Sequence, residues 1–526
     1  MKKNWRKIAA ALLAAATLAG ALSGCGTTET STTDTPQATL PPIDTSVNPS
    51  EPPEGVALKE DIVMGIANAH NSLDAAESGT NYHSYLWRMM QDTLTHFNND
   101  TKELEPWLAT DWSTEDGQTY VFKLRDGVKF HNGETLKASD VVFTFERMEG
   151  TAFGNSIYSS IQSIEAQDEL TVQMTLNEPN MDWPYMMCLP YTSIMSEKAV
   201  TDDPSEGTAV GTGPWQLDSY EFGNYTTLKA FNESWRGAPN AETFTFRTIP
   251  ENSARLIALQ NGEIDICENP ATIEYDIIRG DEGLQLLQYD SSSLTYLAFN
   301  TQAEPGSMED FRKAIAYALD IDALIEVVVN GNATKATSVW GWDQYGYVDM
   351  GGYSRDLDKA KEYLDKAFPN GGASLEISII GSHKTLAQMI QAELGEIGVE
   401  VTISELDAAG IAQAFSSGDY QACTFSIGLN IYGDDTRRLL NPNMTSNTAK
   451  YDNEEVINLM NKASVEMDET ARLEDYAQVQ EILHEDAPYI PLYYPRQAIA
   501  LKAGTGGIDI YSNTHHDFSM TFVPAE

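Results

Sequence analysis

One short stretch of the chain carries several side-chain types that enzymes use for catalysis. The sequence "FKLRDGVKFHNGETLKASDVVFTFERM", residues 122–148, contains Arg125, His131 and several carboxylates. A histidine acts as a general acid or base when a second group lies within hydrogen-bond reach of its ring. No partner for His131 occurs at the spacing of a metal site or a catalytic triad. We therefore interpret His131 as a structural residue between a strand end and a turn.

The pattern around His131 predicts a strand, a turn, a return strand, a second turn and a helix. Apolar residues alternate along 119–124, and the Asp-Gly pair at 126–127 is a hairpin signal because a tight turn needs positive φ. The return strand covers 128–130 and ends at the Asn-Gly pair at 132–133. Apolar residues then recur at helical spacing along 139–148. The stretch is predicted to be scaffold.

No other motif selects a catalytic site. The chain contains no G-x-S-x-G and no H-E-x-x-H sequence, and its 8 histidines are scattered apart from His515-His516. Adjacent residues on a strand point to opposite faces, so this pair is a poor chelate, and we place it in a solvated loop. We predict no catalytic residue, no metal and no cofactor. An exported hydrolase stays an alternative, because the 78 acidic residues leave a carboxylate pair open.

One segment holds more aromatic residues than an ordinary loop. The sequence "SVWGWDQYGYVDM", residues 338–350, places Trp340 and Trp342 among glycines. Rigid aromatic side chains on a glycine-rich backbone give a concave site stacking surface at low entropic cost. We predict that both tryptophans contact a ligand. The alternative is a separate hydrophobic cluster without a ligand.

The N-terminus has the organisation of an exported lipoprotein. A basic head precedes an uncharged apolar run at 8–22, which is too short for a membrane-spanning helix. The run ends in Leu-Ser-Gly-Cys, which resembles a bacterial lipobox. We predict a signal peptide at 1–24, a lipidated Cys25 and a disordered Thr/Pro/Ser-rich tether at 25–56. An ordinary secreted protein is the alternative.

The composition excludes some partners and leaves others open. The formal net charge of −45 would repel nucleic acid and anionic lipid. The body after the tether is too long for one core, so at least two lobes are expected. Three cysteines follow Cys25, at spacings that do not fit a metal site: Cys188, Cys267 and Cys423. We expect them to be small buried residues. The sequence leaves open whether any two of them form a disulfide.

Several blocks together resemble one family. The blocks are "EDGQTYVFKLRDGVKFHNGETLKASDVVFTFERM" (115–148), "GTGPW" (211–215), "LQNGEIDI" (259–266), "LAFNTQAEPGSMEDFRKAIAYALDIDALIEVVVNGNAT" (297–334), "IQAELGEIGVEVTI" (390–403) and "APYIPLYY" (487–494). They resemble, in sequence and order, the family 5 solute-binding proteins, which are the dipeptide-, oligopeptide- and nickel-binding receptors of ATP-binding cassette importers.

The resemblance implies a fold and its boundaries. The expected class is α/β, in the two-lobed periplasmic-binding-protein-like fold with a ligand cleft between the lobes and an extra subdomain in lobe one. Carried over to this chain, lobe one covers 57–295 and lobe two covers 296–488. The segment 489–526 is expected to return to lobe one.

The resemblance also implies candidate ligand contacts in the segment at 425–442. Peptide receptors of the family tend to carry Trp-x-x-Asp-(Tyr/Asn)-x-Asp-Pro here, and the first Asp binds the α-amine of the peptide. That position is Ile431 in this sequence, so Asp434 or Asp435 would have to replace it. We expect these carboxylates to accept from an amine or a hydroxyl and Tyr432 to cover the ligand.

A second candidate region lies early in lobe one. The sequence "NSLDAAESGT", residues 71–80, resembles the Leu-Asp-Pro segment that the family places at the cleft rim, although Ala75 replaces the proline. Tyr82 and His83 follow it directly. We include both as candidate ligand contacts.

The resemblance implies a receptor held outside the cytoplasm by its lipid and docked to a membrane permease with its ATPase. Peptide is the expected ligand, and oligosaccharides, opines and metal chelates are alternatives, since an aromatic cleft also suits sugars. A structural surface lipoprotein is a further alternative to the receptor. The two lobes are expected to close on the ligand.

Overall fold

The structure is a computed structural model, and it describes most of the chain. The described residues are 43–525 with the exception of 78–80, 100 and 152. The predicted signal peptide and Cys25 lie outside the described residues. Within the described part, no helix has the length and apolar character needed to cross a membrane.

The last part of the predicted tether lies against the folded body. The Asn48 side-chain amide donates to the carbonyl of Ile508 at 2.7 Å, and the N–H of Gly507 donates to the carbonyl of Pro49 at 2.8 Å. The side chain of Val47 packs against a hydrophobic core. The ordered chain therefore begins before the predicted end of the tether at residue 56, because backbone hydrogen bonds offset the low apolar content there.

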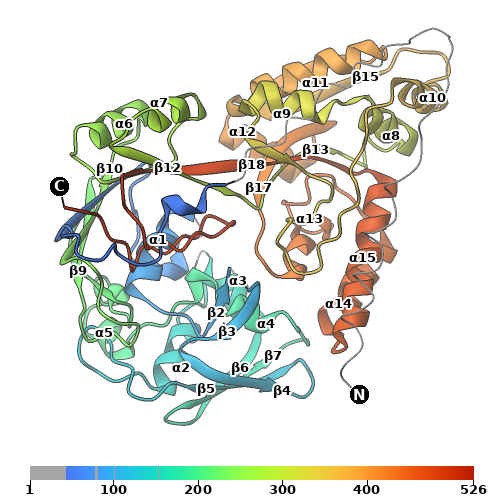
Figure 1. The fold of residues 1–526 in the computed structure, drawn as a ribbon. Helices are drawn as coiled ribbons and strands as arrows, with labels where there is room; N and C mark the ends of the chain where they lie inside the picture. Colours follow the sequence, from blue (N-terminus) through green and yellow to red (C-terminus); the bar gives the residue numbers. More distant parts are fainter. Residues whose placement is uncertain (1–42, 78–80, 100, 152, 526) are drawn as a thin grey trace, which may run out of the picture. The chain divides into compact units, whose positions relative to one another are not determined.

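Most strands belong to one mixed sheet of 12 strands, and strand β18 joins its two halves. The C-terminal part of β18 pairs with β11 and β12, and its N-terminal part pairs with β13 and β14. Figure 1 shows β18 running from one group of strands to the other. The bounds are β11 (Ile266–Glu268), β12 (Leu284–Asp290), β13 (Ser293–Phe299), β14 (Ala333–Lys335) and β18 (Tyr489–Lys502).

We call the half of the sheet that contains β11 and β12, with the elements packed on it, lobe one. Strand β1 pairs in parallel with β10 and β11, and β9 and β8 continue the sheet as an antiparallel edge. Helices α1, α6 and α7 pack on this half. The bounds are β1 (Asp61–Ile66), β8 (Trp215–Glu221), β9 (Tyr225–Ala230), β10 (Thr243–Thr248), α1 (Asn81–Met90), α6 (Asn252–Gln260) and α7 (Tyr275–Arg279).

The half that contains β13 and β14 is lobe two. Its sheet order is β16-β15-β17-β13, with β15 parallel to both of its neighbours. The strands are β15 (Ser374–Ile380), β16 (Glu400–Leu406) and β17 (Ala422–Gly428). The helices are α8 (Glu309–Ala318), α9 (Ile321–Val329), α10 (Leu357–Ala367), α11 (Lys384–Glu396), α12 (Ala408–Ser417), α13 (Arg437–Leu440), α14 (Glu454–Val465) and α15 (Glu469–Asp486).

A separate antiparallel sheet of four strands contains the stretch around His131. Its order is β4-β5-β7-β6, and α2 packs on it over its own hydrophobic core. The bounds are β4 (Ala109–Thr114), β5 (Thr119–Leu124), β6 (Ile161–Asp168), β7 (Thr171–Leu176) and α2 (Ala138–Glu146). The remaining short elements are β2 (Thr95–Asn98), β3 (Glu103–Pro106), α3 (Gly154–Tyr158), α4 (Trp183–Met186) and α5 (Glu197–Asp202). This sheet agrees with the predicted additional subdomain.

The His131 side chain has a structural environment, as the sequence indicated. Its Nδ1 accepts from the N–H of Gly211 at 3.3 Å, and its Nε2 lies 3.0 Å from the carbonyl oxygen of Gly213. Burial lowers the pKa of His131 to about 4, so the ring is neutral. The ring therefore links the turn after β5 to the "GTGPW" turn. The predicted return strand is reduced to one bridge between Lys129 and Thr135.

Two chain segments cross side by side between the lobes. Ser291 follows β12 and precedes β13, and its N–H and hydroxyl both donate to the carbonyl of Pro495 in β18, at 3.3 and 2.8 Å. Arg496 forms an ion pair with Asp290 at 2.8 Å beside this point. The residue boundaries that the resemblance implied for the lobes stay a prediction. Three cysteines are buried, as predicted, and the structure shows that they are free, which the sequence had left open: Cys188, Cys267 and Cys423.

Candidate functional site

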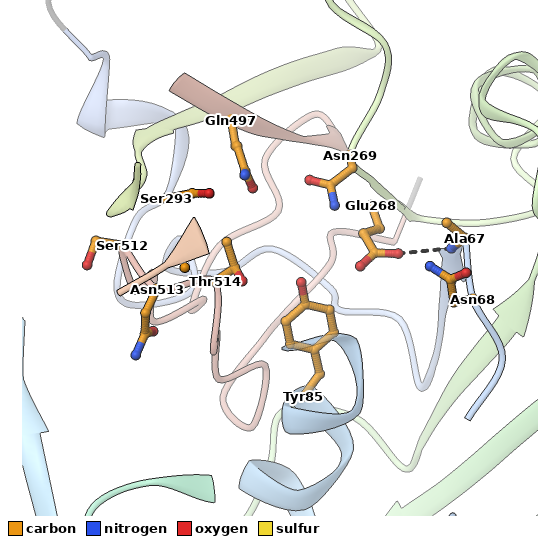
Figure 2. A pocket seen from close by; sticks show the side chains of 11 residues that line it. Ala67, Asn68, Tyr85, Glu268, Asn269, Ser293, Gln497, Ser512, Asn513 and Thr514 are labelled. Carbon is orange, nitrogen blue, oxygen red and sulfur yellow. Dashed lines mark hydrogen bonds between the residues drawn. The ribbon is translucent and has the colours of Figure 1, made fainter. Parts of the chain in front are cut away.

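A cavity of about 240 Å³ lies where the ends of several strands meet. Figure 2 shows the side chains around it, with those of Tyr85, Glu268 and Asn269 on one side and those of Ser293, Ser512 and Asn513 on the other. The full lining is Ala67, Asn68, Tyr85, Glu268, Asn269, Ser293, Gly428, Gln497, Ser512, Asn513 and Thr514. Both lobes contribute, since Ser293 and Gly428 pair across β13 and β17 of lobe two.

Parallel strand pairing brings the lobe one residues together. Strands β1 and β11 run in parallel, so Ala67, after β1, and Glu268, at the end of β11, reach the same edge of the sheet. Ligands of open α/β sheets bind at this kind of edge, outside the carboxyl ends of the strands. Asn269 follows with a φ of 43°, a left-handed conformation that asparagine tolerates and that turns the chain away from the sheet.

Glu268 is a buried carboxylate at the cavity wall. Its side chain accepts a hydrogen bond from the N–H of Ala67 at 2.9 Å, and the residue is 4% exposed. Burial raises the pKa of Glu268 above its ordinary value, although the Ala67 hydrogen bond and the charge of Arg255 oppose the shift. The Tyr85 hydroxyl points toward this carboxylate in Figure 2. Burial, and then the charge of Glu268, raise the pKa of Tyr85 well above 10.

The other polar side chains of the cavity are neutral amides and hydroxyls. Gln497 accepts from the Tyr289 hydroxyl at 2.8 Å, and Asn513 accepts from the backbone N–H of His515 at 3.2 Å. Such groups both donate and accept hydrogen bonds. Together they match a ligand that carries amides or hydroxyls along its length.

The C-terminal loop that supplies Ser512 and Asn513 connects to lobe two. The N–H of Ser292 donates to the carbonyl of Ser512 at 2.9 Å, and the Ser512 hydroxyl donates to the Asp343 carboxylate. A bridge between Asp509 and Asp517 closes the base of the loop. The loop thereby forms part of the cavity wall and contacts both lobes.

The structure places the two predicted tryptophans in different environments. Trp340 is fully buried in the hydrophobic core of lobe two, 6.0 Å from the ring of Tyr476, as in the alternative interpretation of a hydrophobic cluster. Trp342 is half-buried and lines a second cavity of about 470 Å³. The ammonium of Lys102 lies 5.4 Å from its ring centre. Asp343 lines the second cavity and contacts Ser512 of the first.

Of the predicted residues at 432–435, Tyr432 and Asp435 are buried and Asp434 is half-buried, and both carboxylates already have cationic partners. Asp434 pairs with Arg437 at 2.7 Å and Asp435 pairs with Arg438 at 2.9 Å. Tyr432 is buried beside them. None of the three lines the cavity of Figure 2. Their contact with a ligand stays a prediction.

Tyr82 and His83 lie in the first turn of α1, and their side chains are outside the described part of the structure. Tyr85, one turn further along the same helix, lines the cavity instead. Sequence analysis missed Tyr85 although its spacing of three from Tyr82 puts both on one helical face. It also missed Glu268. The sequence feature that could have indicated this residue is its position at the end of a strand.

His515 and His516 are buried, so their predicted place in a solvated loop was wrong. The Nδ1 of His516 accepts from the N–H of Tyr511 at 3.0 Å, and its ring stacks on Tyr85 at 5.7 Å. Burial and the nearby charge of Arg88 lower the pKa of both histidines to about 3. The loop contacts place them inside the wall of the cavity. Among the described residues, no group of three or more potential ligands is suited to a metal ion.

Comparison with known proteins agrees with this architecture. Residues 103–450 match the family described as bacterial extracellular solute-binding proteins, family 5. The chain belongs to this family. A curated family 5 relative is the dipeptide-binding protein of Escherichia coli strain K12, which is 28% identical over 76% of this chain and 82% of its own length.

Two further relatives show the range of solutes in the family. The heme-binding protein A of Haemophilus influenzae is 27% identical over 79% of this chain and 83% of its own length. The solved structure of the periplasmic binding protein DppA from Helicobacter pylori with the peptide STSA is 26% identical, with a TM-score of 0.73 over 89% of this chain and 99% of that one. The two-lobed fold expected for family 5 is confirmed.

Proposed function

We propose that this family 5 protein is the extracytoplasmic receptor of an ATP-binding cassette importer and that its ligand is a peptide. The receptor captures the peptide between its lobes and delivers it to a membrane permease, and a separate ATPase supplies the energy. The relative named for dipeptides and the DppA structure with a bound peptide support this proposal.

The observation that carries the peptide proposal is the chemistry of the cavity in Figure 2. Its lining combines neutral amides and hydroxyls with one carboxylate, that of Glu268. A peptide backbone needs alternating donors and acceptors along its length, which amides and hydroxyls provide, and its N-terminal ammonium needs an anion. A volume of about 240 Å³ suits the end of a short peptide.

The same proposal includes a lipid anchor. The apolar run at 8–22 and the small residues before Cys25 support cleavage at Cys25 and attachment of a lipid to its thiol. One lipid chain alone gives reversible membrane binding, and a diacylglycerol supplies the two chains that stable anchoring requires. The receptor then stays near its permease on the outer side of the cell membrane.

Native mass spectrometry of the protein as purified, and again after incubation with a tripeptide library, tests the ligand class. Binding proteins often retain solute, so we expect adducts whose masses correspond to peptides, at one per protein. Adducts whose masses differ by one hexose unit would indicate that the ligand is an oligosaccharide and not a peptide. A protein that carries no adduct and takes up no tripeptide would contradict the proposal.

A further inference from the structure

Glu268 differs from the other buried acids near the strand ends because it has no cationic partner. Asp265, three residues earlier, pairs with Lys59 at 2.6 Å. Among the described residues, no lysine, arginine or histidine forms an ion pair with the carboxylate of Glu268. An ionised carboxylate that is buried without a partner is strongly unfavourable. The ionised form of Glu268 therefore lacks an ion-pair partner at the wall of the cavity.

The neighbouring arginine does not neutralise this carboxylate. Arg255 donates instead to backbone carbonyls, which include that of Glu268 at 3.2 Å and that of Ile249 at 2.7 Å. Its charge acts on Glu268 only through space. The other titratable groups that face Glu268 are the phenols of Tyr85 and Tyr289, whose pKa values are raised well above 10. The ionised carboxylate of Glu268 can therefore be neutralised by one positive charge from a ligand.

The lining of the cavity selects the kind of group that can supply this charge. Of the 11 lining residues, Glu268 is the only acid and none is a lysine, arginine or histidine. One carboxylate oxygen accepts from the N–H of Ala67, and the Tyr85 hydroxyl also hydrogen-bonds to the carboxylate, so both of these partners are neutral. Tyr85, Asn269 and Asn68 stand around the carboxylate in Figure 2 and offer further oxygen acceptors. A compact ammonium with three donors fits this arrangement.

We propose that Glu268 binds the ammonium group of the ligand, which is the N-terminal amine if the ligand is a peptide. This inference rests on the proposed function and names the residue that recognises the charged end. It also agrees with the pairing of Asp434 and Asp435, whose carboxylates already have arginine partners within their own segment. The amine anchor is thereby moved from lobe two to lobe one.

The test compares a free tripeptide library with the same library acetylated at the N-terminus, using the lipid-free full body of the wild type and of Glu268→Gln. Glutamine keeps the shape of the side chain and removes its charge. We expect Glu268→Gln to weaken binding of the free library by roughly 30-fold or more, because a buried charge pair loses one partner. Binding of the acetylated library should be weak in both proteins and unchanged by the substitution.

Glu393→Gln is the matched control. Glu393 is a buried glutamate of lobe two that also accepts one backbone N–H, that of Asp320, at 2.9 Å, and it does not line the cavity. Its substitution should leave the affinity for both libraries unchanged. Equal binding of free and acetylated peptides by the wild type would overturn the role of Glu268 and leave the peptide receptor intact. Binding of neither library would overturn the proposed function and this inference with it.

A measurement on the wild type does not depend on whether the variant folds. Burial favours the protonated form of Glu268 before the ligand arrives, and an ammonium favours the ionised form. Calorimetric titrations at several pH values, each in two buffers of different ionisation enthalpy, should therefore detect proton release when the free library binds. The acetylated library should release none. Proton uptake, or equal heats in the two buffers at every pH, would contradict an ammonium at Glu268.

Discussion

Asp182 and Asp434 are joined by a hydrogen bond between the two lobes. The N–H of Asp434 donates to Oδ2 of Asp182 at 2.9 Å, and the Tyr476 hydroxyl donates to the same oxygen at 3.3 Å. Asp182 lies directly before α4, whose Trp183 packs in the core of the four-stranded sheet expected in lobe one, whereas Asp434 and Tyr476 belong to lobe two. This contact joins the lobes at a point other than the crossing segments at Ser291 and Pro495.

Removing the Asp182 acceptor should weaken closure. Asp182→Ala leaves the N–H of Asp434 and the Tyr476 hydroxyl without their partner, which disfavours the arrangement that brings the lobes together by about 1–3 kcal/mol. Small-angle scattering should show a smaller radius of gyration for the wild type with peptide than without it, and a reduced difference for the variant. Asp111→Ala, an exposed aspartate of β4, should behave as the wild type. Identical wild-type profiles with and without a bound peptide would contradict lobe closure.

The stability of the protein should depend on pH through Asp434. Burial raises the pKa of Asp434 to about 7, with Arg437 opposing the shift and Asp182 adding to it. The ordinary carboxyl value is about 3.9, so the folded protein binds more protons than the unfolded chain between these values. Stability from this group is present below about pH 4 and is lost as pH rises toward 7. Melting temperatures of Asp434→Asn should fall less across this window than those of the wild type, and parallel curves would contradict the assignment.

The elements that follow local patterns could be predicted from the sequence. The strand expected at 119–124 is β5, and the helix expected at 139–148 overlaps α2 at 138–146. Gly127 and Gly133 both have positive φ, as the two turns required. These features depend on residues that are neighbours in the chain, so alternation, helical spacing and turn residues identify them directly.

The candidate site could not be predicted in the same way. Tyr85, Glu268 and Asn513 come from distant parts of the chain and meet only through the pairing of β1, β11 and β18. Glu268 is one acid among 78, and its position at a parallel strand end becomes visible only with the sheet order. Asp434 and Asp435 were predicted as ligand contacts because they are carboxylates. The prediction did not take into account Arg437 and Arg438, which lie three residues further along the chain and pair with them.

Alanine substitutions of the two tryptophans should have different effects, one on the stability of the protein and the other on peptide binding. Trp340 is fully buried, so Trp340→Ala should lower the free energy of unfolding by about 3–5 kcal/mol. Trp342 is half-buried and lines the second cavity, so Trp342→Ala should mainly weaken peptide binding, by about 1–3 kcal/mol. Denaturant unfolding and peptide titration of both variants measure the two effects. Full affinity in Trp342→Ala would place the ligand outside the second cavity.

The lipid anchor is tested by Cys25→Ser in a Gram-positive host. Serine cannot form the thioether that carries the diacylglycerol, so we expect loss of the lipid label and release of the protein from the membrane fraction. The matched variant Cys188→Ser changes a buried cysteine of the folded body and should keep the label. Membrane retention of Cys25→Ser would indicate a different anchor.

Calorimetric titration of the wild type with a single tripeptide, selected from the native mass spectra, tests the central claim most directly. A receptor of the kind proposed should bind one tripeptide per protein in a saturable manner, and mass spectrometry should recover the peptide intact after prolonged incubation. A titration without saturable heat for any peptide that the mass spectra identify, or recovery of cleaved peptide, would contradict a peptide receptor.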